Sequence, residues 1–186
     1  MPLKHWTALL LIAALASHTR AADVFTLSSA DFKDGAILAK KVGDVPARGP
    51  NCKGDNVSPE LAWANPPGGT RSYAFTVFDP DAGYGVGFVH WVAYGIAPEV
   101  TSFAEGEISQ PSAKYVGGTS GKKLAAFGGP CPPPGSPHHY LFAIIATDLD
   151  PKELPPGLTY AELQEKLKGH RKGESSIVGT YVNPYP

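Results

Sequence analysis

Apolar residues along the chain occur in short runs, separated by turns rich in glycine and proline. Three runs are apolar on both faces of an extended chain, which is typical of strands at the centre of a sheet: residues 72–78, 88–96 and 141–147. Weaker apolar patterns predict further extended segments over residues 22–32, at Ile37, Leu38 and Val42, and over residues 61–63 and 177–181. The pattern therefore predicts a mostly β protein built from many short strands.

One helix is expected near the C-terminus, over residues 160–168. Thr159 comes directly before it and Glu162 follows three residues later, which matches a capping box. Leu163 and Leu167 fall on one face of this helix, so the pattern predicts an amphipathic segment.

Three segments are predicted to be irregular. Residues 127–137, called the proline loop below, contain five prolines, which exclude a central strand or a helix and favour a rigid, extended loop. Residues 100–110 are typical of an irregular hairpin, and residues 114–124 of a glycine-rich surface loop. Gly121-Lys122 looks like the end of a phosphate-binding P-loop, but Lys123 replaces the Ser or Thr that the motif requires.

Composition supports one globular domain. The chain has 186 residues, of which 42% are hydrophobic and 18% charged, so it can bury a core. Its 21 glycines and 19 prolines agree with short strands and many turns. The net charge of −1 gives no electrostatic reason to expect a nucleic-acid partner.

The N-terminus has the pattern of an export signal. Lys4 precedes an apolar run over residues 6–16, which is too short to span a bilayer but suits a signal peptide. We expect cleavage after Ala21, which would leave a domain of residues 22–186 with 14 basic and 17 acidic residues. An uncleaved amphipathic anchor is the alternative, and no cysteine follows the run as a lipoprotein would require. The mature protein is thus predicted to be periplasmic or secreted.

The two cysteines, Cys52 and Cys131, are expected to form a disulfide, because exported proteins meet an oxidising environment. A bridge closing so long a loop contributes about 4–5 kcal/mol in the chain-entropy account. Two free thiols or half of a metal site are the alternatives, although neither cysteine has metal-ligand spacing.

Ionisable residues accompany each of the three strongest strands. Asp79 and Asp81 end the first, His90 lies inside the second, and His138 opens the third. Each has an ordinary reading, as a turn residue or as a hydrogen-bonded core histidine. Because placing such groups against apolar strands costs several kcal/mol unless they are paired, we expect the three polar ends to converge on one pocket.

These segments resemble a known family. Residues 72–96 are similar to the first signature block of the phosphatidylethanolamine-binding proteins, in which Asp-Pro-Asp-Ala precedes a strand containing His-Trp. Residues 127–147 resemble the second block, a Gly-Pro-Pro-x-Gly loop followed by His-Arg-Tyr. Residues 52–63 and 178–181, with Gly169-His170, resemble the bacterial, Raf-kinase-inhibitor-like branch, so the resemblance covers nearly the whole mature chain.

The resemblance implies two antiparallel sheets packed as a Greek-key-like sandwich with a C-terminal helix. It also implies an anion pocket at one end of the sheets, whose residues correspond to Asp79, Asp81, His90, Pro133, His138 and Tyr140. Gly83 stands where the family usually has proline, and His139 where it usually has arginine. Both departures bear on ligand preference more than on the fold.

A non-enzymatic binding protein for a small anion or zwitterion is the leading functional hypothesis. The imidazoles would meet a phosphate while Asp79 or Asp81 meets an ammonium, as in phosphoethanolamine. Brief contact with phospholipid headgroups fits this hypothesis. A protein-interaction module that inhibits a kinase or a protease is one alternative. A hydrolase using the histidines and carboxylates, with or without a metal, is the other, but no nucleophile turn, cofactor motif or metal-ligand spacing supports it.

Overall fold

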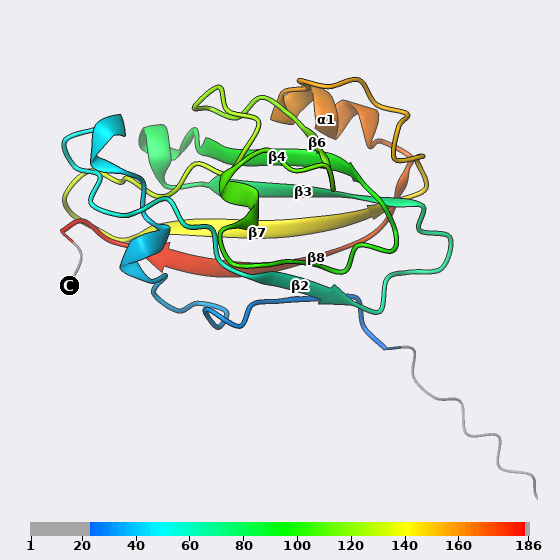
Figure 1. Cartoon of the computed structure of the whole chain (residues 1–186), viewed down its shortest axis with the longest axis horizontal. Helices are drawn as coiled ribbons and strands as arrows, with labels where there is room; N and C mark the ends of the chain where they lie inside the picture. The colour runs from blue at the N-terminus through cyan, green and yellow to red at the C-terminus, as the bar shows by residue number, and fades with distance from the viewer. Residues whose placement is uncertain (1–22, 185–186) are drawn as a thin grey trace, which may run out of the picture.

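The computed structural model describes residues 23–184 and contains two antiparallel sheets and one α-helix (Figure 1). The larger sheet has the order β6 (Val116–Gly117), β4 (Phe88–Ile96), β3 (Ser72–Asp79), β7 (His138–Thr147) and β8 (Arg171–Tyr181). The smaller sheet has the order β1 (Thr26–Ser28), β2 (Leu61–Ala64) and β5 (Ser102–Phe103). The helix α1 spans Tyr160–Lys166. The predicted two-sheet fold with a C-terminal helix is confirmed.

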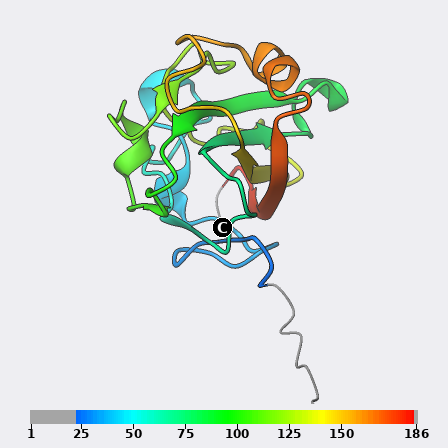
Figure 2. The ribbon, with the colours of Figure 1, turned by 90° about the vertical axis from the view of Figure 1, so that its right-hand side faces the viewer.

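The larger sheet is covered on both faces, which explains why its central strands are apolar throughout. One face meets the smaller sheet through an aromatic cluster, in which the Trp63 ring lies 6.2 Å from that of Phe75 and 5.4 Å from that of Phe103. The other face packs against Leu163 of α1 and against Leu167, which directly follows the helix; both are buried. Figure 2 shows this layering, with the helix and the N-terminal segment on opposite sides of the sheet.

The capping box at α1 is confirmed. The Thr159 hydroxyl accepts a hydrogen bond from the Glu162 backbone N–H at 3.3 Å, and the Glu162 carboxylate accepts from the Thr159 backbone N–H at 2.8 Å. The helix ends at Lys166, two residues before the predicted end.

We expect Thr159→Ala to lower the free energy of unfolding by about 1 kcal/mol, because one backbone N–H of the first turn loses its acceptor. Urea denaturation measures the change. Glu165→Ala is the control, since this exposed carboxylate bonds only the Lys168 side chain and should cost under half as much. Equal losses in the two variants would contradict a role for the cap.

Two predicted elements were wrong. The weak strand at Ile37, Leu38 and Val42 stops after a few residues beside β8, and Lys40–Val42 form a 3-10 helix instead. This segment buries Val42 by turning inward and has no alternating pattern that would hold it along a sheet edge. Residues 100–110 do not form a hairpin, because β5 pairs with β2 and a 3-10 helix, Glu107–Ser109, follows.

The predicted signal peptide lies outside the described residues. Within residues 23–184, no helix has the length and apolar character needed to cross a membrane.

Candidate functional site

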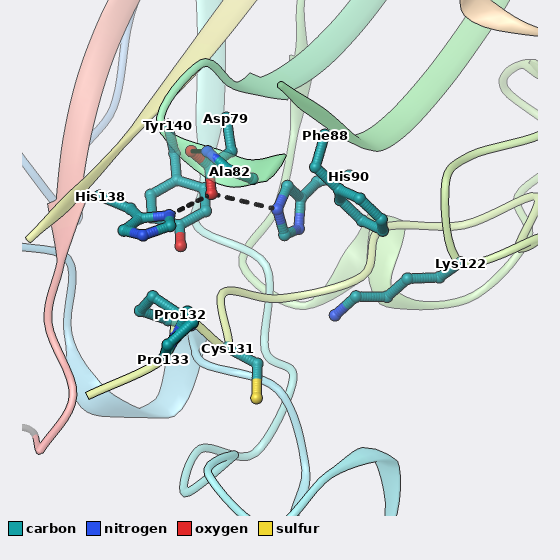
Figure 3. Close-up of a pocket in the computed structure, with 10 residues that line it drawn as sticks. All are labelled: Asp79, Ala82, Phe88, His90, Lys122, Cys131, Pro132, Pro133, His138 and Tyr140. Carbon is teal, nitrogen blue, oxygen red and sulfur yellow. Dashed lines mark hydrogen bonds and ion pairs between the residues drawn. The ribbon is translucent and has the colours of Figure 1, made fainter. Parts of the chain in front are cut away.

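A pocket of about 180 Å³ lies where β3, β4 and β7 bring their polar ends together (Figure 3). Antiparallel pairing causes this convergence, because Asp79 at the end of β3 pairs with Phe88 at the start of β4, and β7 begins with His138 on the other side of β3. The lining residues are Asp79, Ala82, Phe88, His90, Lys122, Cys131, Pro132, Pro133, His138 and Tyr140.

Asp79 organises one side of the pocket. Its Oδ1 accepts hydrogen bonds from the backbone N–H groups of Asp81 at 2.9 Å and Ala82 at 3.1 Å, which fixes the turn after β3. Its Oδ2 lies 2.8 Å from Nδ1 of His138. Both carboxylate oxygens therefore have partners within the protein, and the residue is only 2% exposed.

His90 is buried within β4, with its side chain 5% exposed. Its Nδ1 lies 2.6 Å from the carbonyl oxygen of Gly128, and its Nε2 lies 3.9 Å from Oδ2 of Asp79. The ring makes edge contacts with Phe88 and Tyr140, each 5.1 Å between centroids. Burial lowers the pKa of His90 to about 4, so the imidazole is neutral near pH 7.

Tyr140 supplies a donor without a partner. Its hydroxyl is buried and has no partner at hydrogen-bonding distance among the described residues, and the nearby Asp79 carboxylate interacts with it from farther away. Burial, and then the negative charge of Asp79, raises the pKa of Tyr140, which keeps the phenol protonated. A buried donor in this state favours a ligand that brings an acceptor.

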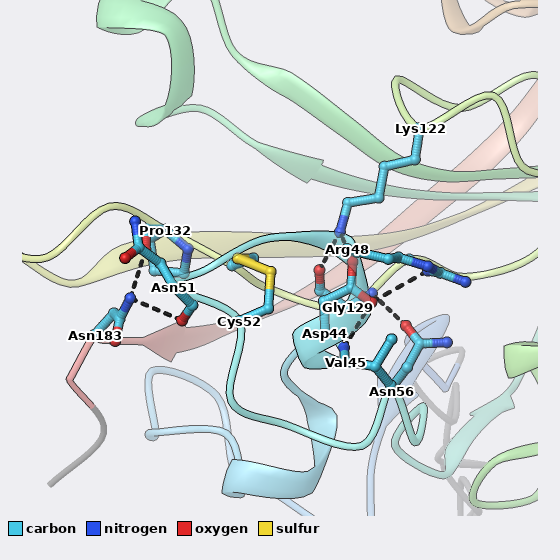
Figure 4. Close-up of a disulfide and its surroundings, with 12 residues drawn as sticks. Asp44, Val45, Arg48, Asn51, Cys52, Asn56, Lys122, Gly129, Pro132 and Asn183 are labelled. Atoms are coloured by element: carbon cyan, nitrogen blue, oxygen red, sulfur yellow. Dashed lines mark hydrogen bonds and ion pairs between the residues drawn. A yellow bond between two sulfur atoms is a disulfide. The ribbon is translucent and has the colours of Figure 1, made fainter.

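The proline loop forms the opposite wall of the pocket, and the predicted Cys52–Cys131 disulfide, which is confirmed, links the loop to the segment that contains Cys52. The loop also has polar attachments. The Gly129 N–H donates to Oδ1 of Asn56 at 2.7 Å, and the side-chain amide of Asn183 donates to the carbonyl of Pro132 at 3.1 Å. Figure 4 shows the bridge and these attachments together.

Lys122 is a pocket residue that the sequence did not predict. Its Nζ donates to the Gly129 carbonyl at 2.7 Å and forms an ion pair with Asp44, whose carboxylate is fully buried and also lies 3.2 Å from Arg48 (Figure 4). Burial lowers the pKa of Lys122. The glycine-rich loop over residues 114–124 therefore does more than cover the surface, because its lysine is held by Asp44, 78 residues earlier, and by the nearby Gly129 carbonyl.

Five of the six predicted site residues line this pocket: Asp79, His90, Pro133, His138 and Tyr140. Asp81 does not. Its carboxylate accepts hydrogen bonds from the backbone N–H of His139 at 2.7 Å and from the His139 ring at 2.8 Å. These bonds lower the pKa of Asp81.

The two departures from the family pattern have visible consequences. His139 makes a half-exposed pair with Asp81 outside the pocket lining. Gly83 has φ of +60°, a conformation that a proline ring cannot adopt. The turn after β3 therefore has a backbone conformation that excludes the usual family residue, proline.

The lining combines a few polar side chains with apolar walls. No group of three or more His, Cys, Asp or Glu side chains within residues 23–184 is placed to hold a metal. Two imidazoles and one phenol face a small space with otherwise apolar walls, an arrangement typical of a binding site for a small ligand.

Comparisons with known proteins identify the family of the chain and agree with its fold. A family model described as phosphatidylethanolamine-binding protein matches residues 28–182. LppC of Mycobacterium tuberculosis, named as a lipoprotein, is 36% identical over 87% of this chain and 74% of its own length. A UPF0098 protein of Aquifex aeolicus is 30% identical over 85% of this chain and 88% of its own. The crystal structure of Escherichia coli YbcL, titled a member of the mammalian PEBP family, has a TM-score of 0.75 and 32% identity, covering 85% of this chain and 98% of that one.

Proposed function

The chain belongs to the phosphatidylethanolamine-binding protein family, and on this premise we propose that it is an exported, non-catalytic protein that binds a small oxyanion of the phosphate type. The observation that carries the proposal is the buried Tyr140 hydroxyl, a donor without a partner, beside two imidazoles whose Nδ1 atoms are already engaged. Each imidazole therefore has only its Nε2 left to meet a ligand.

The size of the pocket favours a headgroup over a whole lipid. Its volume of about 180 Å³ is below the roughly 300–1,000 Å³ of pockets that hold drug-sized ligands. The walls from Phe88, Pro132 and Pro133 exclude water from one side of the ligand, which strengthens the polar contacts on the other.

The carboxylates leave at most one free acceptor position for an ammonium inside the pocket. Both oxygens of Asp79 have protein partners, and Asp81 is bonded to His139 outside the lining. We therefore expect the phosphate group to supply most of the affinity, and phosphate and phosphoethanolamine to bind within about threefold of one another. Acetate, with fewer acceptor oxygens, should bind more weakly than either.

Export is supported by the disulfide and by the lipoprotein name of one relative. The alternative of an inhibitor module would be tested by asking whether exposed loops, such as residues 114–124, are needed for a protein partner, and in that segment Lys122 already lines the pocket. A catalytic role is less favoured because the pocket lining contains no serine or threonine, and its cysteine is in a disulfide.

We expect His138→Ala to weaken phosphate binding by about tenfold or more, because a hydrogen bond to a charged ligand contributes about 1.5–3 kcal/mol. Isothermal titration calorimetry near pH 6 measures the affinity. His139→Ala is the matched control, since this neighbouring ring contacts Asp81 outside the pocket lining and should change the affinity by less than about twofold. No phosphate binding by the folded wild-type protein, or equal losses in the two variants, would contradict the proposal.

A further inference from the structure

The hydrogen bonds around the two imidazoles fix the same tautomer in both. The partner of His90 Nδ1 is the Gly128 carbonyl, and the partner of His138 Nδ1 is the Asp79 carboxylate. A carbonyl and an ionised carboxylate only accept hydrogen bonds, so each Nδ1 carries a hydrogen. In the neutral ring, Nε2 is then a bare acceptor on both histidines.

This arrangement leaves the pocket short of donors for an anion. Two of the three N–H groups of the Lys122 ammonium are already engaged, with Asp44 and with the Gly129 carbonyl. The Tyr140 hydroxyl is the donor that has no partner among the described residues. An oxyanion without a proton would meet the bare Nε2 of His90, and behind it the Asp79 carboxylate 3.9 Å away. Both contacts are repulsive.

The surroundings keep His90, in particular, uncharged before a ligand arrives. The charged and titratable groups around it are Asp79 on β3, His138 and Tyr140 on β7, Lys122 after β6, and Asp44. The carboxylates and the Gly128 carbonyl raise the pKa of His90, whereas Lys122 and, above all, burial lower it. His138 differs because its side chain is 16% exposed.

Resting on the oxyanion site proposed above, we propose that the pocket binds an oxyanion together with one proton shared with Nε2 of His90. It therefore selects monoprotonated phosphate groups over oxyanions that carry no proton. A monoprotonated phosphate ester brings the proton itself, and its P–O–H donates to Nε2 with no exchange with solvent. A fully ionised oxyanion binds only when Nε2 takes one proton from solvent, and the resulting N–H then donates to the anion. The charge of the complex is the same in both routes.

Methyl phosphate and sulfate are suitable probes, because the second pKa of a phosphate monoester is about 6 whereas sulfate carries no proton at any pH used here. Calorimetric titration in two buffers of different ionisation enthalpy counts the protons taken up. At about pH 7.5 we expect both ions to take up about one proton. At about pH 5 methyl phosphate should take up none, whereas sulfate still takes up about one. As the pH rises from about 5 to about 7.5, the affinity for sulfate should fall about tenfold for each pH unit.

Two variants assign the proton to one ring. In His90→Gln an amide N–H supplies the missing donor, so both anions should bind without proton uptake. His138→Gln is the matched control and should lose affinity while keeping the uptake. Wild-type binding of both ions without proton uptake at about pH 7.5 would overturn the inference, as would uptake that disappears only in His138→Gln. If neither ion bound at either pH value, the result would instead overturn the proposed function. The number of protons taken up by the wild type tests the inference even if a variant does not fold.

Discussion

Replacement of Asp79 by alanine is expected to lower the free energy of unfolding by about 3–5 kcal/mol, because three N–H groups lose a buried acceptor and each loss costs about 1–3 kcal/mol. The substitution removes the acceptor of the Asp81 and Ala82 backbone N–H groups at the end of β3. It also removes the group that fixes the ring of His138. We therefore expect phosphate affinity to fall by about tenfold or more as well. Chemical denaturation and calorimetric titration measure the two effects.

Asp81→Ala is the matched control for this prediction. It removes a carboxylate two residues away, half-exposed and bonded only to His139. We expect it to cost under about 1 kcal/mol and to leave phosphate affinity within about twofold of the wild type. If Asp81→Ala weakened binding as strongly as Asp79→Ala, the placement of Asp81 outside the pocket would be wrong.

Asp79→Asn keeps the role of this residue testable if the alanine variant does not fold. The amide oxygen can still accept from the two backbone N–H groups, so its NH₂ group must face His138. That ring would then have to offer a bare Nδ1, and its hydrogen would move to Nε2. Nitrogen-15 NMR at a pH where the ring is neutral distinguishes the two tautomers. An unchanged tautomer in Asp79→Asn would show that the carboxylate does not orient His138.

The central strands and the helix could be predicted because their signals are local. Residues 72–78 and 88–96 are apolar on both faces, and both faces of their sheet are covered. Thr159 and Glu162 mark the start of α1 within four residues. The small sheet could not be predicted in full, because β5 has only two residues and exists through its pairing with β2.

In the candidate site, too, the residues with a local signal could be predicted and those that depend on distant segments could not. Asp79, His90 and His138 could be recognised because each is a polar residue placed against an apolar strand. Lys122 could not, because its surroundings depend on Asp44, 78 residues earlier, and on the backbone of the proline loop. Asp81 was placed in the pocket by its sequence neighbours, yet its side chain turns to His139 on β7. Spacing along the chain does not specify which of two nearby carboxylates faces inward.

The disulfide is expected to couple the stability of the protein to its affinity for the anion. Cys52 and Cys131 are 79 residues apart, so removing the bridge should lower the free energy of unfolding by about 4–5 kcal/mol in the chain-entropy account. Gly128 and Gly129 would stay attached through the His90 carbonyl and the Asn56 side chain. The segment from Cys131 to Pro133 would keep fewer attachments, and it forms the wall facing His138. We therefore expect the Cys52→Ala/Cys131→Ala double variant to bind phosphate about three- to tenfold more weakly.

Leu163→Ala separates lost stability from lost affinity. This side chain is fully buried between α1 and the face of the sheet away from the smaller sheet, so its truncation should cost about 2–5 kcal/mol without touching the pocket. We expect Leu163→Ala to bind phosphate as tightly as the wild type, measured at a temperature where both proteins are folded. Equal weakening in Leu163→Ala and in the double cysteine variant would mean that affinity follows global stability. Unchanged affinity in the cysteine variant would mean that the polar attachments alone hold the wall, because Asn183 still bonds the Pro132 carbonyl at 3.1 Å.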